Sequence, residues 1–265
     1  MSANEEVGSK DPGLRVERDG WVAWLVLDRP HRRNAIDRRM RVLLRDAATE
    51  LEADDDVRVV VLTGSGDTFC AGTDLKEQPA DPPPHPLADR GEPIAAAIER
   101  FTKPVIAAVN GPAAGGGLEL ALAADLRIAA SSARFSLPEV RVGSLPGSGG
   151  TQRLFIAVPP AVAWKMLLTG GPIDAEEALR CGLVSNVVEP GELRAHVTEV
   201  ATAIAENAPL SVRAAKAAGR AGLEHRLATG LALERSLWAL LATTEDRAEG
   251  RRAFREGRPP DYHGR

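Results

Sequence analysis

Cysteine and aromatic residues are both scarce in this chain of 265 residues, which has two cysteines and 4% Phe, Trp and Tyr. Cys70 and Cys181 lie far apart in the sequence, so no disulfide framework is predicted and a reducing, cytoplasmic compartment fits best. Because aromatic rings are few while Ala, Val, Leu and Gly abound, we expect a core of closely packed small side chains.

An excess of positive charge is also lacking. Lys and Arg number 33 and Asp and Glu number 37, a formal net charge of −4, which does not favour nucleic acid or an anionic membrane as a partner. The longest apolar stretch, residues 105–130, is broken by glycines and by charged residues such as Glu119 and Asp125, so it is a poor membrane span. The polar, acidic residues 1–10 lack the apolar segment of a signal peptide. We expect neither a nucleic acid nor a membrane partner.

What is present is the composition of a globular protein, with 44% hydrophobic and 26% charged residues. The first two thirds of the chain alternate predicted strands with predicted helices, and the last part is all helix, which predicts an α/β core with a helical C-terminal region. The composition breaks at residues 207–209. The predicted organisation is a flexible tail over residues 1–12, the core over 13–206 and the C-terminal helical region over 207–265.

Hydrophobic periodicity and capping residues predict the individual elements. Asp37 and Thr244 are expected to cap helix N-termini, and Asp174 begins a helix that Gly182 ends. The Pro-rich segment 78–93 is predicted to form no regular element. Predicted strands cover residues 21–28, 57–63, 105–109, 126–129 and 184–188; predicted helices include 94–101, 192–206 and 245–256, and one with an apolar stripe of Leu227, Leu231, Trp238 and Leu241.

Several patterns fall short of known catalytic or binding motifs. The Gly64-Ser65-Gly66 turn follows a predicted strand, but Phe69 occupies the position of the third glycine in a dinucleotide fingerprint. Residues 111–117 have the glycine spacing of a phosphate loop without its Lys and Ser/Thr, and Ser148 is not framed as Gly-x-Ser-x-Gly. The five histidines are scattered without metal-ligand spacing. These patterns weaken nucleotide, serine-hydrolase and metal interpretations, and no metal is expected.

Three segments combine glycines and polar residues with predicted buried strands: 69–76, 110–120 and 137–150. Consecutive glycines at a helix N-terminus, as in residues 115–117, allow close approach of a ligand and leave N–H groups without intrahelical partners. Those N–H groups lie at the positive end of the helix dipole, which suits an anion or a developing oxyanion. Close packing of helix on strand is the alternative role for the same glycines.

Two glutamates in these segments are candidates for proton transfer. Glu119 lies among apolar residues in an early helical turn, where partial burial would prepare its carboxyl group for acid–base chemistry. Glu139 follows Pro138 and precedes a glycine-rich turn. The alternative is that each is an ordinary surface acid, in a salt bridge or a solvated loop. The two reach one cleft only if the chain folds back between them.

A series of short motifs runs in order along nearly the whole chain, from about Leu14 to Tyr262. They are Asn34-Ala35-Ile36, Phe69-Cys70-Ala71-Gly72-Thr73-Asp74-Leu75-Lys76, Gly115-Gly116-Gly117-Leu118-Glu119-Leu120-Ala121, Leu137-Pro138-Glu139, Gly147-Ser148-Gly149-Gly150-Thr151-Gln152-Arg153-Leu154, Leu168-Thr169-Gly170, Gly182-Leu183-Val184 and Ala253-Phe254. In order and spacing, this set resembles the crotonase family, also called the enoyl-CoA hydratase/isomerase superfamily.

The resemblance implies an α/β, crotonase-like spiral of β-β-α units with a C-terminal helical region that builds trimers, often paired into hexamers. It also implies acyl-CoA thioester substrates, an enolate of the thioester carbonyl, and no cofactor, since CoA is part of the substrate. The backbone N–H groups of Thr73 and Gly116 match the oxyanion hole. The positions that match substrate and CoA contacts are Ala71, Thr73, Asp74, Leu75, Lys76 and Gly116.

Hydratases of this family carry two glutamates, and Glu119 and Glu139 fall on the matching positions. As a pair they would hold a water, deliver it to C3 of a 2-enoyl thioester and transfer a proton at C2, with Gly147 near that water. The resemblance therefore favours an enoyl-CoA hydratase that assembles as a homotrimer or a dimer of trimers. A Δ3,Δ2-enoyl-CoA isomerase, or another crotonase-fold acyl-CoA enzyme, is the alternative, and a non-catalytic scaffold or RNA-binding member is a third.

The chain departs from the family pattern in two places. The Pro-rich residues 78–93 replace a more helical segment that shapes the acyl pocket, so the acyl length stays open. Gly257 stands where many members have Lys, which weakens a C-terminal contact to a CoA phosphate. Arg255 and Arg258 are the candidates to replace that contact.

Overall fold

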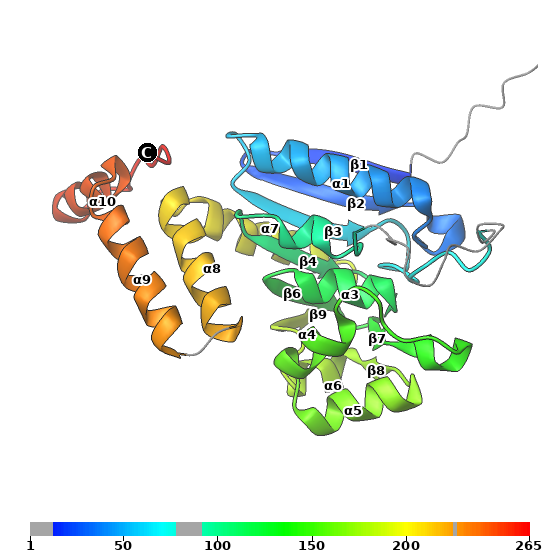
Figure 1. Cartoon of the computed structure of the whole chain (residues 1–265). Helices are drawn as coiled ribbons and strands as arrows, with labels where there is room; N and C mark the ends of the chain where they lie inside the picture. The colour runs from blue at the N-terminus through cyan, green and yellow to red at the C-terminus, as the bar shows by residue number, and fades with distance from the viewer. Residues whose placement is uncertain (1–12, 78–91, 225–226) are drawn as a thin grey trace, which may run out of the picture.

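The computed structural model describes residues 13–77, 92–224 and 227–265, so the predicted tail over 1–12 and residues 78–91 of the Pro-rich segment lie outside the described residues. A six-stranded sheet forms the centre, in the order β1-β2-β3-β4-β6-β9 (Figure 1). Its first pair is antiparallel and the other neighbours are parallel. The strands are β1 (Gly13–Asp19), β2 (Val22–Asp28), β3 (Val59–Gly64), β4 (Val105–Val109), β6 (Leu126–Ala130) and β9 (Asn186–Val188).

The predicted strands are confirmed, with ends that shift by at most two residues. β4 is buried throughout, and β3 is buried up to its last residue, Gly64, as their near-continuous apolar runs predict. β1 is an edge strand in which Gly13 alone is buried, so no apolar run marks it. The sequence signal for it is the Asp19-Gly20 turn, which joins it to β2 as a hairpin.

Helices cover both faces of the sheet (Figure 1). One face carries α1 (Arg38–Ala53), α2 (Ala96–Glu99) and α3 (Gly116–Ala123), whose apolar side chains join the larger core cluster. The other face carries α7 (Leu193–Ala205), which packs on the central strands. Asp37 caps α1 as predicted, accepting a hydrogen bond from Met40 N at 2.8 Å.

A second sheet of three short strands, in the order β5-β7-β8, is not predicted, because two or three residues are too few to show alternation. A short helix packs on this sheet. Asp174 caps its N-terminus by accepting from Glu177 N at 2.8 Å, and Gly182, at φ +80°, lies just past its end. The elements are β5 (Ala113–Ala114), β7 (Arg134–Ser136), β8 (Ile173–Asp174), α4 (Gly150–Ala157), α5 (Pro160–Thr169), α6 (Ala175–Arg180) and the 3-10 helices η1 (Pro30–Arg32) and η2 (Pro138–Val142).

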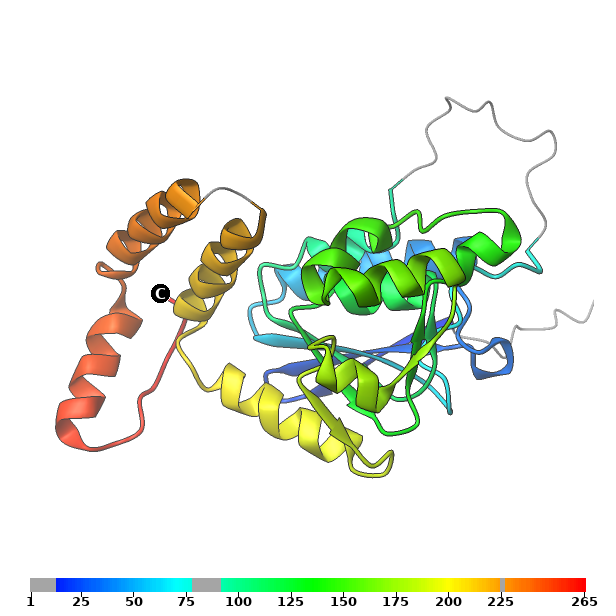
Figure 2. The ribbon, with the colours of Figure 1, turned by 90° about the horizontal axis from the view of Figure 1, so that it is seen from below.

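The C-terminal helices α8 (Pro209–Glu224), α9 (Leu227–Leu241) and α10 (Glu245–Glu256) lie to one side of the sheet rather than on it (Figures 1 and 2). Thr244 caps α10 as predicted. The apolar stripe of α9 faces outward: Leu227 is 75% exposed and Trp238 is 62% exposed. A domain boundary at residue 207 stays a prediction. In the described ranges no helix combines the length and the apolarity needed to cross a membrane.

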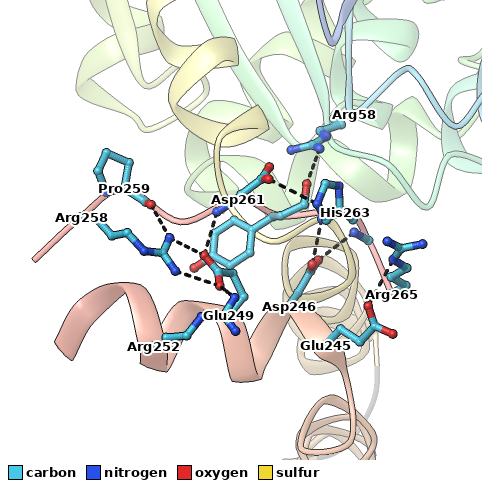
Figure 3. A network of polar contacts seen from close by, with 12 residues as sticks. Arg58, Glu245, Asp246, Glu249, Arg252, Arg258, Pro259, Asp261, His263 and Arg265 are labelled. Atoms are coloured by element: carbon cyan, nitrogen blue, oxygen red, sulfur yellow. Dashed lines mark hydrogen bonds and ion pairs between the residues drawn. The ribbon is translucent and has the colours of Figure 1, made fainter. Parts of the chain in front are cut away.

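The end of the chain returns to α10 and to the core (Figure 3). Arg58 donates from Nη2 to Tyr262 O at 2.7 Å, and its guanidinium lies 3.9 Å from the ring centroid of Trp21. On α10, Glu249 accepts a hydrogen bond from Arg258 at 2.6 Å. These contacts connect the last residues to the sheet and to the C-terminal helices.

Candidate active site

Glu119 lies in α3, a helix in which every residue is buried, and is itself 3% exposed. The helix begins after Gly115, whose φ of +54° is in the left-handed region. The Oε1 atom of Glu119 accepts hydrogen bonds from Ser148 N at 2.6 Å and Gly150 N at 2.9 Å, and no described residue donates to its Oε2 atom. Two N–H donors on one oxygen hold a carboxylate in a fixed orientation.

Glu139 comes from η2, which begins at Pro138. Its Oε2 atom is buried and has no hydrogen-bond partner among the described residues. Its Oε1 atom lies 3.1 Å from the point that a Cβ atom on Gly115 would occupy, so the carboxyl group sits against the N-terminus of α3. Burial raises the pKa of Glu139, and the negative charge of Glu119 raises it further. The chain does fold back between the two glutamates.

The loops that follow β3 and β4 run side by side. Cys70 N donates to Pro112 O at 3.1 Å, and Ala114 N donates to Cys70 O at 2.9 Å. A Cβ atom on Gly72, which has φ +87°, would lie 3.2 Å from Gly116 N. The two glycine-containing segments named in the sequence are therefore in contact beside the start of α3.

The backbone N–H groups of Thr73 and Gly116 have no acceptor in the described part of the chain, and neither do those of Leu75, Gly117 and Leu118. Thr73 is framed by two main-chain hydrogen bonds, since Ile36 N donates to Gly72 O at 2.7 Å and Asp74 N donates to Ile36 O at 2.9 Å. Unpaired donors beside a helix N-terminus suit an oxygen that carries negative charge.

Some of the glycines also allow close packing, as one of the sequence alternatives predicts. A Cβ atom on Gly117 would lie 2.2 Å from Cys70 O, and one on Gly72 would lie 2.8 Å from Ala114 O. These approaches exclude a larger residue. Packing needs Gly72 and Gly117, while the neighbouring Gly116 contributes an N–H group that has no acceptor among residues 13–77, 92–224 and 227–265.

Asn34 links the segment that follows β2 to the loop that follows β3, a role that the sequence pattern does not predict. It is fully buried, and its Nδ2 atom donates to Ser65 O at 2.9 Å and Thr68 O at 2.7 Å, while Oδ1 accepts from Arg29 N at 2.9 Å. These bonds satisfy a buried amide that would otherwise be unfavourable. The available signal is a polar residue in the Asn-Ala-Ile motif, just before the cap of α1.

Asp74, which is predicted to contact CoA, uses its carboxylate inside the protein. Its Oδ2 atom pairs with Arg29 Nη2 at 3.3 Å, and Oδ1 accepts from Lys76 N at 3.0 Å. Arg29 also pairs with Asp37 at 3.0 Å. These contacts fix the segment that carries Thr73, and a contact of Asp74 with CoA stays a prediction.

The remaining predicted site residues lie at the surface around the same loops. Gly147 is exposed, and a Cβ atom there would have no neighbour within 4 Å. It directly precedes Ser148, the donor to Glu119. Among residues 71–76, the exposed ones are Ala71, Thr73, Leu75 and Lys76.

An apolar cavity of about 550 Å³ lies next to the loop that holds Glu119. Pro146 connects the two features: a Cβ atom on Gly150 would lie 2.9 Å from Pro146 Cβ and 3.1 Å from Glu119 Oε1. Phe155 and Trp164 pack edge to face in the cavity wall, with ring centroids 4.8 Å apart. The wall also includes Val140, Leu145 and Leu168.

A model of a protein family described as enoyl-CoA hydratase/isomerase matches residues 17–265 of the chain. The chain belongs to the enoyl-CoA hydratase/isomerase family. The match spans both glutamates, the loops that carry Thr73 and Gly116, and the C-terminal helices. The resemblance carried by the ordered motifs is confirmed.

Relatives and solved structures agree with this membership over nearly the whole chain. A protein of Thauera aromatica named (E)-benzylidenesuccinyl-CoA hydratase is 48% identical over 256 residues, 95% of this chain and 99% of the relative. The 2,3-dehydroadipyl-CoA hydratase of Escherichia coli K12 is 44% identical over 255 residues, again 95% and 99%. The crystal structure of enoyl-CoA hydratase from Bacillus anthracis has a TM-score of 0.88 at 38% identity, covering 96% of this chain and all of the other. The crotonase-like α/β fold is thus confirmed.

The departure from the family pattern at Gly257 has a structural cause. Gly257 ends α10 with φ +66°, a conformation that favours glycine over lysine. Arg258 is one candidate to replace the lysine. Its guanidinium is hydrogen-bonded to Glu249 and Glu256 of the same chain.

Proposed function

We propose that this protein is an enoyl-CoA hydratase, which adds water reversibly across the C2–C3 double bond of a 2-enoyl-CoA. The observation that carries the proposal is the approach of Glu119 and Glu139 to each other, with Oε2 of Glu139 buried and without a partner among the described residues. A buried polar atom without a partner is unfavourable, which supports a role toward a ligand or water. The hydratase names of relatives at 48% and 44% identity support the same reaction.

In the proposed reaction, the N–H groups of Thr73 and Gly116 donate to the thioester oxygen as it gains negative charge in the enolate. The positive end of the α3 dipole adds to this stabilisation. In other oxyanion holes one such donor lowers the barrier by about 3 kcal/mol. Because the donors are backbone groups, the threonine side chain at position 73 does not alter them.

The surroundings of the two carboxyl groups support different roles. Glu119 accepts two N–H groups at Oε1, so Oε2 is the oxygen that takes a proton from the water attacking C3. Burial raises the pKa of Glu139 and favours its protonated form, so Glu139 gives its proton to C2. Gly147 leaves space for the water. Proton exchange with solvent then restores both groups.

CoA is proposed to lie along residues 71–76, where the exposed Lys76 offers a positive charge to a phosphate. Adding water to a double bond transfers no net electrons, so the proposed reaction needs no redox cofactor. The apolar cavity lined by Pro146 is proposed to receive the acyl group. A panel of substrates of graded acyl length identifies which acyl group it accepts.

The test is an assay of the purified protein on 2-enoyl-CoA substrates of graded acyl length, followed by loss of the conjugated enoyl-thioester absorbance. Hydration is expected, and Glu119→Gln and Glu139→Gln are each expected to lower kcat at least a hundredfold, in the range of lost acid–base catalysis of about 10²–10⁴. Glu176→Gln, at an exposed glutamate of α6, is the matched control. No hydration of any substrate would refute the proposal.

The runner-up, a Δ3,Δ2-enoyl-CoA isomerase, uses one glutamate. It would be favoured if Glu139→Gln kept full activity and the protein shifted the double bond of a 3-enoyl-CoA. A non-catalytic scaffold or RNA-binding protein would be favoured if calorimetry detected no binding of acyl-CoA. The N–H groups of Thr73 and Gly116, which have no acceptor among the described residues, and the two neighbouring glutamates support catalysis instead.

We also propose that the protein assembles as a homotrimer or a dimer of trimers in the cytoplasm. The outward apolar stripe of α9 supports association, since Leu227, Leu231 and Trp238 are each more than half exposed. The two cysteines are unpaired, which suits a reducing compartment. Light scattering coupled to size-exclusion chromatography tests the assembly, and cell fractionation tests the location.

A further inference from the structure

The loop that holds Glu119 is itself bound by one arginine. Arg153, on α4, donates from Nη1 to Ser148 O at 2.7 Å. Ser148 N donates to Glu119 Oε1 at 2.6 Å, and Gly150 N donates to the same atom at 2.9 Å. The peptide between Ser148 and Gly149, whose carbonyl Arg153 binds, lies between the two peptides whose N–H groups hold Glu119.

The loop fits closely around the guanidinium. Gly149 has φ +95°, and a Cβ atom on it would lie 1.9 Å from Arg153 Nη1. Among the described residues, Glu119 and Arg153 provide the side chains that hydrogen-bond to the main chain of residues 146–150. One binds the N–H groups of this segment and the other binds a carbonyl, so the segment is fixed from both sides.

A second contact fixes Arg153 itself. Its Nη2 atom pairs with Glu99, which ends α2, and the two side chains are 25% and 38% exposed. A guanidinium can serve two partners in fixed directions because its donors lie in one rigid plane. Arg153 therefore links α2 to the loop through its two terminal nitrogens.

We propose that Arg153, oriented by Glu99, is a positioning residue for Glu119. By fixing the 148–149 peptide it aims the N–H groups of Ser148 and Gly150, and these set the direction of the Glu119 carboxylate. The inference rests on the proposed hydration reaction, in which Glu119 Oε2 must face the attacking water. A shift of about 1 Å in a reacting group can lower a rate a hundredfold.

The experiment measures kcat, KM and amide hydrogen exchange in Arg153→Met, Arg153→Lys and Glu99→Gln. Arg153→Met is expected to lower kcat about ten- to a hundredfold with KM changed less than about threefold, because substrate contacts stay intact while Glu119 is misdirected. The amides of Ser148 and Gly150 should exchange faster. Arg153→Lys keeps the charge and should recover part of kcat.

Glu99 should act only through Arg153. Glu99→Gln is expected to lower kcat less than Arg153→Met, and to have no further effect when Arg153 is already methionine. Glu176→Gln is the matched control, because Glu176 pairs with Arg180 at the surface of α6 and lies outside this chain of contacts. It should change neither kcat nor exchange at residues 148 and 150.

A folded Arg153→Met protein with the kcat of the wild type would overturn the inference, as would a lowered kcat with unchanged exchange at Ser148 and Gly150. If Arg153→Met does not fold, Glu99→Gln decides by the same two measurements. Failure of the wild type to hydrate any 2-enoyl-CoA is a separate result that refutes the proposed reaction, and hydrogen exchange still tests whether Arg153 fixes the loop.

Discussion

The backbone N–H of Ser148 lies 2.6 Å from Oε1 of Glu119, so a residue 29 positions further along the chain orients the glutamate of α3. Gly150 N supports the same oxygen at 2.9 Å. The carboxylate is thus held by main chain, and its direction depends on the backbone of the loop rather than on the identity of a partner side chain. This makes the glycines around Ser148 the first positions to test.

Gly150→Ala is expected to lower kcat by about tenfold or more while the protein stays folded. The new Cβ atom would lie 2.9 Å from Pro146 Cβ and 3.1 Å from Glu119 Oε1, so the loop has to shift and the bond from Gly150 N loosens. The measurement is steady-state kinetics with a 2-enoyl-CoA that the wild type hydrates. Gly219→Ala on α8, where a Cβ atom has no neighbour within 4 Å, is the control and should keep kcat. Equal kinetics for both variants would contradict this account of Gly150.

Glu139→Gln is expected to gain stability relative to the wild type as pH rises. The folded protein raises the pKa of Glu139 above its ordinary value of 4.5, mainly by burial, so the native state binds the proton more tightly than the unfolded chain does. Ionisation therefore destabilises the wild type increasingly from about pH 4.5 up through the raised pKa. Denaturant midpoints of both proteins at about pH 4 and pH 8 measure it. A difference between the midpoints that does not change with pH would argue against the shift.

Much of the sheet could be predicted, because β3 and β4 are apolar runs bounded by turns. The three-stranded sheet could not, since its strands are too short to leave a pattern. The stripe on α9 is visible in the sequence, but periodicity does not show that Leu227 and Trp238 face outward. Whether an apolar stripe meets its own core or another surface depends on tertiary packing.

The two glutamates could also be predicted from the sequence, since each stands in a motif and the ordered motifs resemble one family. That the two carboxyl groups lie close together could not be predicted, because it depends on how η2 folds back toward the start of α3. The supports of Glu119 leave no side-chain signature, as they are N–H groups of Ser148 and Gly150. Arg153 and Asn34 donate hydrogen bonds to backbone carbonyl groups. Every residue has such a carbonyl group, so the sequence does not indicate which one is bound.

The two thiols are expected to react very differently in the folded protein. Cys70 is fully buried in the segment that leads to Thr73. Burial raises the pKa of its thiol to about 12, so almost no thiolate forms at pH 8. Cys181 is partly exposed. A chromogenic disulfide reagent should titrate one thiol in native protein and two in denaturant, and none in native Cys181→Ser. Rapid reaction of Cys70 without denaturant would show that the loop opens.

The contacts of Glu249 with the end of the chain are expected to weaken in acid (Figure 3). Arg258, followed by the N–H of Asp261, donates to Glu249 and lowers its pKa from the ordinary 4.5 to about 2. The stabilisation is complete above about pH 4.5 and is lost as pH falls toward 2, because the proton must then displace these donors. Glu249→Gln should therefore be less stable than the wild type at pH 7, with a difference in melting temperature that narrows below about pH 4.5. Glu176→Gln, at an exposed glutamate that pairs with Arg180 within α6, is the control. A difference that stays constant down to about pH 3 would mean that this carboxylate does not anchor the tail.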